Sequence, residues 1–255
     1  MEHSRFWYAC ELESRYGAVK RARGQYLYTQ SGARLVDMYQ EGGRAVLGWG
    51  AGKALTHCKN TANRGALGTF ITAEQHRLHR AVHNLLPLYT QVRWYGGAAA
   101  AEAARAAVSA ELWRPWGEDA RSECVWFAPP FPWGGDTVII CCKDAAHDAR
   151  LLESDLLAPP VLAGMTRALY DLAAELPRRD ESLWRRHDKI LLKYWKRRGP
   201  YLYPLVSEKN YTNFFLHCLD CGLYISPQYK TASIVPHEAS DGDFTRLKRR
   251  PYDAE

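Results

Sequence analysis

The chain has 255 residues, which is enough for one large domain or two smaller ones that each bury a core. Its content of 47% apolar and 24% charged residues excludes a disordered chain. Residues 185–198 hold seven Lys or Arg and one Asp, so they account for the whole formal charge of +6 and exclude a protein that is basic throughout.

The distribution of apolar residues and cysteines predicts a cytoplasmic protein. No run of eighteen apolar residues occurs, so no membrane span is expected. The segment from Met1 to Trp7 lacks the basic-then-apolar layout of a secretory signal. The seven cysteines are scattered and odd in number, with Cys141 next to Cys142, and this favours reduced thiols over a disulfide framework.

Residues 6–47 are predicted to form short strands separated by turns, and a helix is expected to follow them. Apolar and aromatic residues alternate or cluster in Tyr26–Tyr28, Arg34–Met38 and Ala45–Leu47, which favours strands. Gly42-Gly43 supplies the turn chemistry between two of them. A helix is expected over residues 51–64.

The next segment predicts one half of an α/β unit. Thr72 is a predicted helix N-cap with Gln75 as its capping-box partner, and Pro87 ends that helix. A strand is expected over Gln91–Tyr95, followed by two glycines and an alanine-rich helix over 98–111.

The second half continues this pattern. Thr137–Cys142 is short, apolar and β-branched, which predicts a buried parallel strand. Pro159-Pro160 starts the next helix, and a polar, basic helix is expected over 180–197. A further helix over 210–221 ends at Gly222 in the C′ position. Strands and a short last helix follow.

Four blocks, in this order, resemble the class III aminotransferases and glutamate-1-semialdehyde aminomutase, which are fold-type I pyridoxal-phosphate enzymes. The blocks begin with Ser31-Gly-Ala-Arg-Leu-Val-Asp, Leu86-Pro-Leu-Tyr-Thr-Gln-Val-Arg-Trp, Pro159-Pro-Val-Leu-Ala and Tyr211-Thr-Asn-Phe-Phe. The last block continues to Gly222-Leu-Tyr-Ile-Ser-Pro, which is similar to the family's "Gly-Ile-Tyr-Leu-Ala-Pro".

The resemblance implies an α/β fold, a reduced version of the fold-type I architecture with a mainly parallel central sheet covered by helices. It also implies a small α+β domain formed by both termini, from residues 1–65 and 197–255. Residues 66–196 would form the reduced large domain, because only residues 111–157 stand where relatives have several more strand–helix units.

The cofactor-binding groups of that family are mostly absent from this sequence. In the family an "Asn-Ser-Gly-Thr-Glu-Ala" loop at a helix N-terminus holds the cofactor phosphate. The aligned residues are Gly96, Gly97 and Ala98, so both hydroxyls are lost, at a cost of about 3–6 kcal/mol in binding. The "Asp-Glu-Val" strand end that holds the pyridine nitrogen is not recognisable either. Gly96, Gly97 and Ala98 are therefore either a degenerate phosphate loop or a glycine turn before a packing helix. We expect that no cofactor is bound.

Lys143 is the candidate catalytic residue if the protein is active. It follows the predicted strand Thr137–Cys142, where a Schiff-base lysine sits in such folds, and apolar neighbours would favour its neutral, nucleophilic form. Asp144 acts in the opposite sense, and the usual glycine-rich loop does not follow. The alternative function is thus an aminotransferase or aminomutase that uses pyridoxal phosphate and Lys143.

The basic segment supplies a third hypothesis. Arg185, Lys189, Lys193 and Arg197 fall at i, i+4 spacing on the predicted helix, with aromatic residues interleaved. Such a stripe is typical either of a solvated helix face or of a surface that binds nucleic acid or an acidic partner. The His217-Cys218-x-x-Cys221 half of a zinc site has no second pair, so core packing is favoured and no metal is expected.

Together these patterns predict a non-catalytic, aminotransferase-like protein that interacts with another macromolecule. A homodimer is implied by the resemblance, because members of the family build their site across a two-fold interface.

Overall fold

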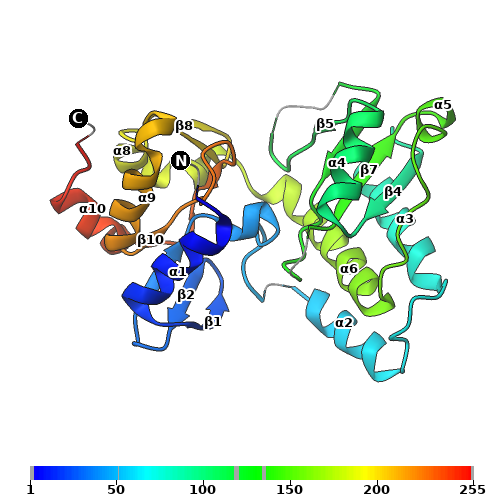
Figure 1. Ribbon diagram of the computed structural model, residues 1–255, viewed down its shortest axis with the longest axis horizontal. Coiled ribbons are helices and arrows are strands. Elements are labelled where there is room, and N and C mark those ends of the chain that lie inside the picture. The colour runs from blue at the N-terminus through cyan, green and yellow to red at the C-terminus, as the bar shows by residue number, and fades with distance from the viewer. Residues whose placement is uncertain (1–2, 51, 118–120, 134–135, 254–255) are drawn as a thin grey trace. The chain divides into compact units, whose positions relative to one another are not determined.

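The computed structural model describes residues 3–50, 52–117, 121–133 and 136–253 (Figure 1). Contacts divide the chain into two compact units, one made of residues 1–51 and 179–255 (unit 1) and one of residues 52–178 (unit 2). The sequence-based division set the boundaries at 65/66 and 196/197 instead. The difference arises because the helix after residue 53 packs within unit 2, whereas His187 lies 3.0 Å from the Ala239 carbonyl in unit 1.

Unit 1 joins both ends of the chain in two small sheets. The first has the order β1-β2-β3-β10, antiparallel except for the parallel pair β3 and β10. The second has the order β11-β9-β8 and is antiparallel. The strand bounds are β1 Val19–Arg23, β2 Tyr26–Thr29, β3 Arg34–Asp37, β8 Trp195–Arg198, β9 Tyr201–Pro204, β10 Leu223–Tyr224 and β11 Ser233–Ile234. The small α+β unit is therefore formed by both termini.

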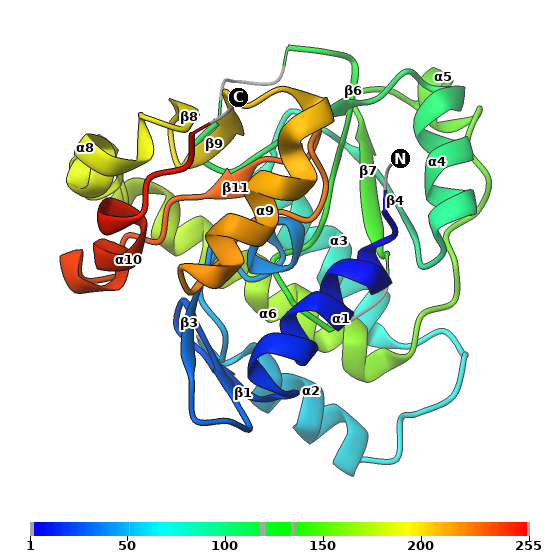
Figure 2. The same cartoon turned by 60° about the vertical axis from the view of Figure 1, so that its left-hand side comes forward.

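Short helices cover these sheets. Their bounds are α1 Arg5–Tyr16, η1 Gln40–Gly43, α7 Glu181–Trp184, η3 Arg185–His187, α8 Asp188–Leu191, η4 Glu208–Asn210, α9 Tyr211–Asp220, η5 Asp241–Phe244 and α10 Thr245–Arg249. Helices α1 and α9 lie side by side (Figure 2), and the rings of Tyr8 and Phe215 are 4.5 Å apart between centroids.

Two predictions for the N-terminal segment are wrong. Residues 5–16 form a helix rather than strands, because Ser4 accepts the Trp7 N–H as an N-cap and Leu12 is buried one turn after Tyr8. The predicted strand at residues 45–47 is a turn instead. Residues 45–47 pair with no strand among the described residues, and an apolar cluster without such a partner does not form a strand.

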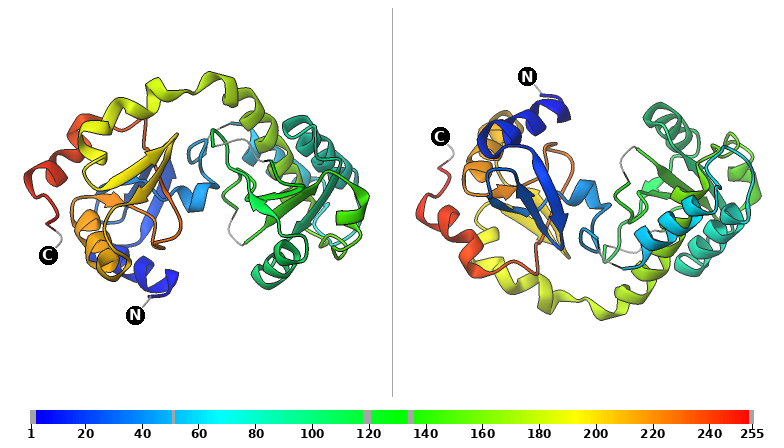
Figure 3. Two further views of the ribbon diagram at one scale, coloured as in Figure 1. Left: turned by 90° about the horizontal axis from the view of Figure 1, so that it is seen from above. Right: turned by 90° about the horizontal axis from the view of Figure 1, so that it is seen from below.

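Unit 2 is a four-stranded sheet between helices. The strands are β4 Gln91–Tyr95, β5 Glu111–Leu112, β6 Cys124–Phe127 and β7 Val138–Cys142, in the order β4-β7-β6-β5. The helices are α2 Ala54–Asn63, α3 Ala73–Leu85, α4 Ala98–Ala107, α5 Ala145–Asp148, α6 Pro159–Glu175 and η2 Leu176–Arg178. One face of the sheet packs on α2, α3 and α6 and the other on α4 (Figure 3).

The α/β class is confirmed, but the prediction of a mainly parallel sheet is wrong. Strand β7 is antiparallel to both of its neighbours, β4 and β6, and only β5 and β6 are parallel. The described residues between β6 and β7, 128–133 and 136–137, form no helix, and a connection without a crossover helix reverses strand direction. Ile139 and Cys141 face one core cluster while Val138, Ile140 and Cys142 face the other. Burial on both faces gives the same apolar run as a parallel strand, so the sequence pattern could not separate the two cases.

The local helix signals are confirmed. Thr72 and Gln75 form the capping box of α3, which ends at Leu85 before Pro87. Helix α6 begins at Pro159, and Gly222 follows α9 with a φ of 84°. Within the described residues, no helix is both long and apolar enough to cross a bilayer.

Candidate functional site

The structure places the two parts of the predicted cofactor site at opposite edges of the unit 2 sheet. Tyr95 pairs with Val138, and Gln91 pairs with Cys142. Gly96 therefore follows β4 at one edge, whereas Lys143 follows β7 at the other. Four residue steps of antiparallel strand separate these edges by about 14 Å. Lys143 is not brought together with the glycine turn.

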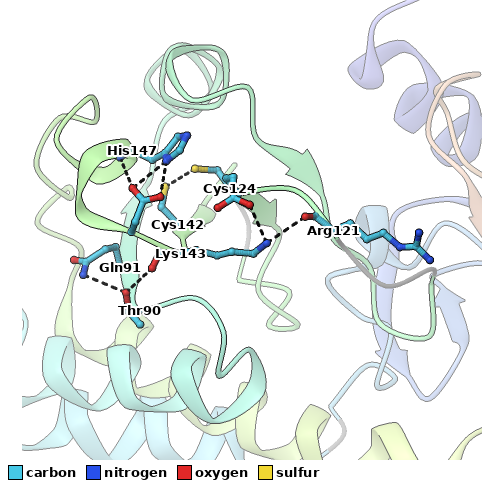
Figure 4. Close-up of polar contacts among 9 residues, drawn as sticks. Thr90, Gln91, Arg121, Cys124, Cys142, Lys143 and His147 are labelled. Carbon is cyan, nitrogen blue, oxygen red and sulfur yellow. Dashed lines mark hydrogen bonds and ion pairs between the residues drawn. The ribbon is translucent and has the colours of Figure 1, made fainter.

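The Lys143 ammonium group is engaged in contacts at its own edge (Figure 4). Its Nζ lies 3.2 Å from Glu123 Oε1 and donates to the Arg121 carbonyl, also at 3.2 Å. The Lys143 carbonyl accepts a hydrogen bond from the Thr90 hydroxyl. The side chain is 28% exposed, so it is not the desolvated amine that the sequence hypothesis requires.

Asp144 does not approach the Lys143 amine in the described contacts. Its carboxylate accepts the His147 backbone N–H and lies 2.9 Å from His147 Nδ1, and it caps the short helix α5 (Figure 4). These hydrogen bonds hold the pKa of Asp144 below its usual value. The Asp144–His147 pair therefore stabilises the turn that follows β7.

Residues 154–157, which precede α6, pack against the glycine turn at Gly96. The Gly96 N–H donates to Asp155 Oδ2 at 2.7 Å, and a Cβ on Gly96 would lie 2.7 Å from Leu157 Cδ2. The Asp155 N–H and carbonyl both bond to Trp94, through its carbonyl and its indole N–H. Residues 154–157 are thus fixed against the end of β4. The Asp155 carboxylate accepts the Gly96 N–H, which is the group that would bind a phosphate in the related loop.

Gly97 and Ala98 begin helix α4 without further contacts of this kind. Gly97 is the N-cap, in an extended conformation with φ −115° and ψ 142°, and it makes no side-chain cap. A Cβ at Gly97 would meet nothing within 4 Å. Of the two glycines aligned with the phosphate loop, Gly96 therefore has its N–H bonded to a protein carboxylate, whereas Gly97 has open space around it.

No lysine follows the strands that end at the Gly96 edge. Unit 2 contains three lysines by sequence, at positions 53, 59 and 143. Lys53 is the N-cap of α2 and Lys59 lies within α2. The stretch from residue 60 to residue 142, which forms all four strands, holds no primary amine.

The basic segment does not form the predicted helix over 180–197, and the stripe prediction is wrong. The chain runs through α7, η3 and α8 and then enters strand β8, because Tyr194 and Trp195 are buried in the core of unit 1. Arg197 is only 10% exposed and pairs with Asp188 at 2.8 Å and Glu181 at 2.9 Å. Arg185 also pairs with Glu181, at 3.4 Å. Lys189 and Lys193 are exposed, and nucleic-acid binding by this segment stays a prediction.

A pocket lined mainly by polar residues, which the sequence patterns did not reveal, lies between α2, α3 and α6. Its volume is about 500 Å³, and its lining includes Arg64, Glu74, Arg77, Thr166, Arg167 and Tyr170. Polar residues recur on each of these helices at spacings of three, four or seven. That spacing was the available signal, but it cannot show which helices pack together.

Solved structures of aminotransferases share the fold of this chain. Ornithine δ-aminotransferase of Plasmodium falciparum matches with a TM-score of 0.68 and 13% identity, covering 93% of this chain and 94% of that chain. An ω-transaminase from Sphaerobacter thermophilus matches at 0.66 with 10% identity, covering 94% and 95%. The acetylornithine aminotransferase of Elizabethkingia anophelis matches at 0.65 with 12% identity, covering 96% and 98%.

The sequence comparisons add one relative. An uncharacterized protein of Treponema pallidum (strain Nichols) is 28% identical over 286 residues, covering 90% of this chain and 92% of that protein. No protein-family model matches the chain. On the strength of the structural matches, the chain has a fold-type I aminotransferase-like fold.

Proposed function

We propose that this protein has lost pyridoxal-phosphate catalysis and acts as a non-catalytic, homodimeric interaction protein in the cytoplasm. The observation that carries the proposal is the hydrogen bond from the Gly96 N–H to the Asp155 carboxylate. It places a negative charge of the protein itself where the fold would seat a phosphate.

The residues at this edge do not fit the cofactor. A phosphate dianion would meet the like charge of Asp155, and Gly96 and Ala98 offer no hydroxyl to bind it. A covalent cofactor linkage also needs a lysine, and Lys143 lies at the opposite sheet edge in an ion pair with Glu123. Phosphate binding and the covalent linkage are therefore disfavoured for independent reasons.

Exposed apolar side chains support an interface on unit 2. Leu67, Phe70 and Ile71 lie in one connection between α2 and α3, with exposed fractions of 62%, 51% and 78%. The exposed apolar residues of this connection favour protein–protein contact. The seven free cysteines support a reducing compartment.

The loss of catalysis is tested by reduction of the protein with borohydride in the presence of equimolar pyridoxal phosphate, followed by peptide mapping. We expect no stoichiometric lysine adduct and no cofactor absorbance after gel filtration. The variant Lys143→Arg keeps the charge beside Glu123 and should behave like the wild type. A stoichiometric adduct at Lys143 that this variant abolishes would overturn the proposal.

The dimer is tested separately by sedimentation velocity. We expect the wild type to sediment as a dimer and Ile71→Asp to shift it toward monomer. The matched control is Leu205→Asp, which places the same charge at a 59% exposed leucine in unit 1. A monomeric wild type, or equal dissociation of the two variants, would refute the assigned interface.

A further inference from the structure

The pocket between α2, α3 and α6 has the size and the lining of a small-molecule site. Its volume of about 500 Å³ lies within the usual range for ligand pockets. One wall contains Ala163 and Tyr170 from α6, which provide apolar surface. The rest of the lining consists of polar side chains from all three helices.

Two guanidinium groups are fixed at the pocket wall by a buried carboxylate. Glu74, with a side chain only 7% exposed, lies 2.7 Å from Arg77 Nη1 and 3.4 Å from Arg64 Nη2. Arg64 Nη2 also donates to the Thr61 hydroxyl at 3.1 Å. These described contacts use one nitrogen of each arginine, so each guanidinium has further N–H groups with which to meet a ligand.

Helix α6 also contributes polar atoms that have no hydrogen-bond partner among the described residues. Thr166 is 8% exposed, and its Oγ1 makes no hydrogen bond among the described residues. Nε of Arg167 is likewise buried without a partner there, although Nη2 of the same side chain pairs with Asp171 at 2.6 Å. Burying unpaired donors is unfavourable, and an acceptor that reached either atom from the pocket would remove that penalty.

We propose that this pocket binds a small oxyanion, that is, a metabolite with a carboxylate or phosphate group. Three guanidinium groups stand against the two carboxylates of Glu74 and Asp171, so the wall has a positive excess. Guanidinium forks match carboxylate and phosphate oxygens in geometry, and the Thr166 hydroxyl can donate to the same group. The apolar wall then receives the body of the ligand. This inference does not depend on whether catalysis has been lost.

The test is calorimetric titration of the full-length protein with inorganic phosphate, sulfate and citrate, and with chloride at matched ionic strength. Thr166→Val should weaken binding about tenfold, the loss of one hydrogen bond to a charged ligand. The same variant should melt at or above the wild-type temperature without ligand, because it removes an unpaired buried hydroxyl. A residue that only supports the fold would show the opposite pattern, with an unchanged affinity and a lower melting temperature.

A charge-conserving pair of variants isolates the arginine contribution. Arg77→Lys keeps the positive charge beside Glu74 but loses the planar fork, so binding should weaken about tenfold. Arg80→Lys makes the same change on α3 at an exposed position outside the lining and should leave binding unchanged. Stronger binding of phosphate and sulfate than of citrate would identify the ligand as a phosphate compound, and the reverse order would identify a carboxylate.

A second measurement does not require variants. A dicarbonyl reagent that modifies arginine should react more slowly at Arg64 and Arg77 when the anion is present, with Arg80 as the internal reference. The proposal is overturned if none of the anions binds at concentrations up to about 10 mM. It is also overturned if binding is equal in the wild type, Thr166→Val and Arg77→Lys, or if the anion protects Arg80 as much as Arg64 and Arg77.

Discussion

The backbone N–H of Gly96 and the carboxylate of Asp155, 59 positions apart in sequence, form a hydrogen bond of 2.7 Å. This bond ties the end of β4 to the segment that leads into α6. It also brings a fixed negative charge next to the N-terminus of α4, where the helix dipole favours an anion. The hydrogen-bonding potential of the Gly96 N–H is thus satisfied by the protein itself.

Replacement of Gly96 by alanine should lower the free energy of unfolding by up to about 1 kcal/mol, because the flexible end of the Leu157 side chain must move away from the new methyl group. Chemical denaturation measures the change. The neighbouring variant Gly97→Ser has open space and adds an N-cap hydroxyl, so it should alter stability by only about 0.3 kcal/mol. Equal effects of the two variants would show that residues 154–157 do not pack on Gly96.

Asp37 should make the stability of unit 1 depend on pH. Burial raises the pKa of its carboxyl group from 3.8 to about 6, although hydrogen bonds from the Gln40, Trp49 and Tyr39 N–H groups oppose the shift. The folded state therefore binds this proton more tightly than the unfolded state. The resulting stabilisation is complete below pH 3.8 and is lost as the pH rises through about 6.

The variant Asp37→Asn cannot titrate and should lose this dependence. Between pH about 4 and about 7, its free energy of unfolding relative to the wild type should rise by about 2 kcal/mol. Urea unfolding of both proteins across this range measures the difference. Parallel pH profiles would contradict the assignment of a raised pKa to Asp37.

Arg197 and Lys193 should respond differently to truncation, although the sequence placed them on one stripe. Arg197→Ala leaves the carboxylate of Asp188 without its partner in a mostly buried site and should cost about 3 kcal/mol of stability. Lys193→Ala changes an exposed side chain and should stay within about 0.5 kcal/mol of the wild type. Thermal or urea unfolding distinguishes them, and a neutral Arg197→Ala would remove the structural role proposed for this arginine.

The cysteines should differ sharply in reactivity in the native protein. Six are buried, and burial raises the pKa of Cys141 and Cys218 well above the ordinary value, so their thiolates are scarce. Cys10 is the partly exposed one. Mass spectrometry after brief alkylation should find modification at Cys10 alone, and Cys10→Ser should abolish it. Rapid native modification of Cys141 would show that the sheet of unit 2 opens readily.

Several local features of this protein were determined by its sequence alone. The capping box of Thr72 and Gln75, the start of α6 at Pro159 and the end of α9 before Gly222 each depend on groups within one turn of the chain. The order of the four resembling blocks likewise predicted the aminotransferase-like fold that the structural matches support. The helix ends could be predicted because each depends on the chemistry of a few residues that are close in sequence.

Only the tertiary structure decided the direction of β7, and with it the position of Lys143. A strand buried on both faces has the same composition in either direction, so its direction depends on how the chain returns from β6. The pairing of Gly96 with Asp155 and the meeting of Arg64, Arg77 and Arg167 around one pocket also join distant segments. These contacts depend on which surfaces pack against each other, and local periodicity carries no information about that choice.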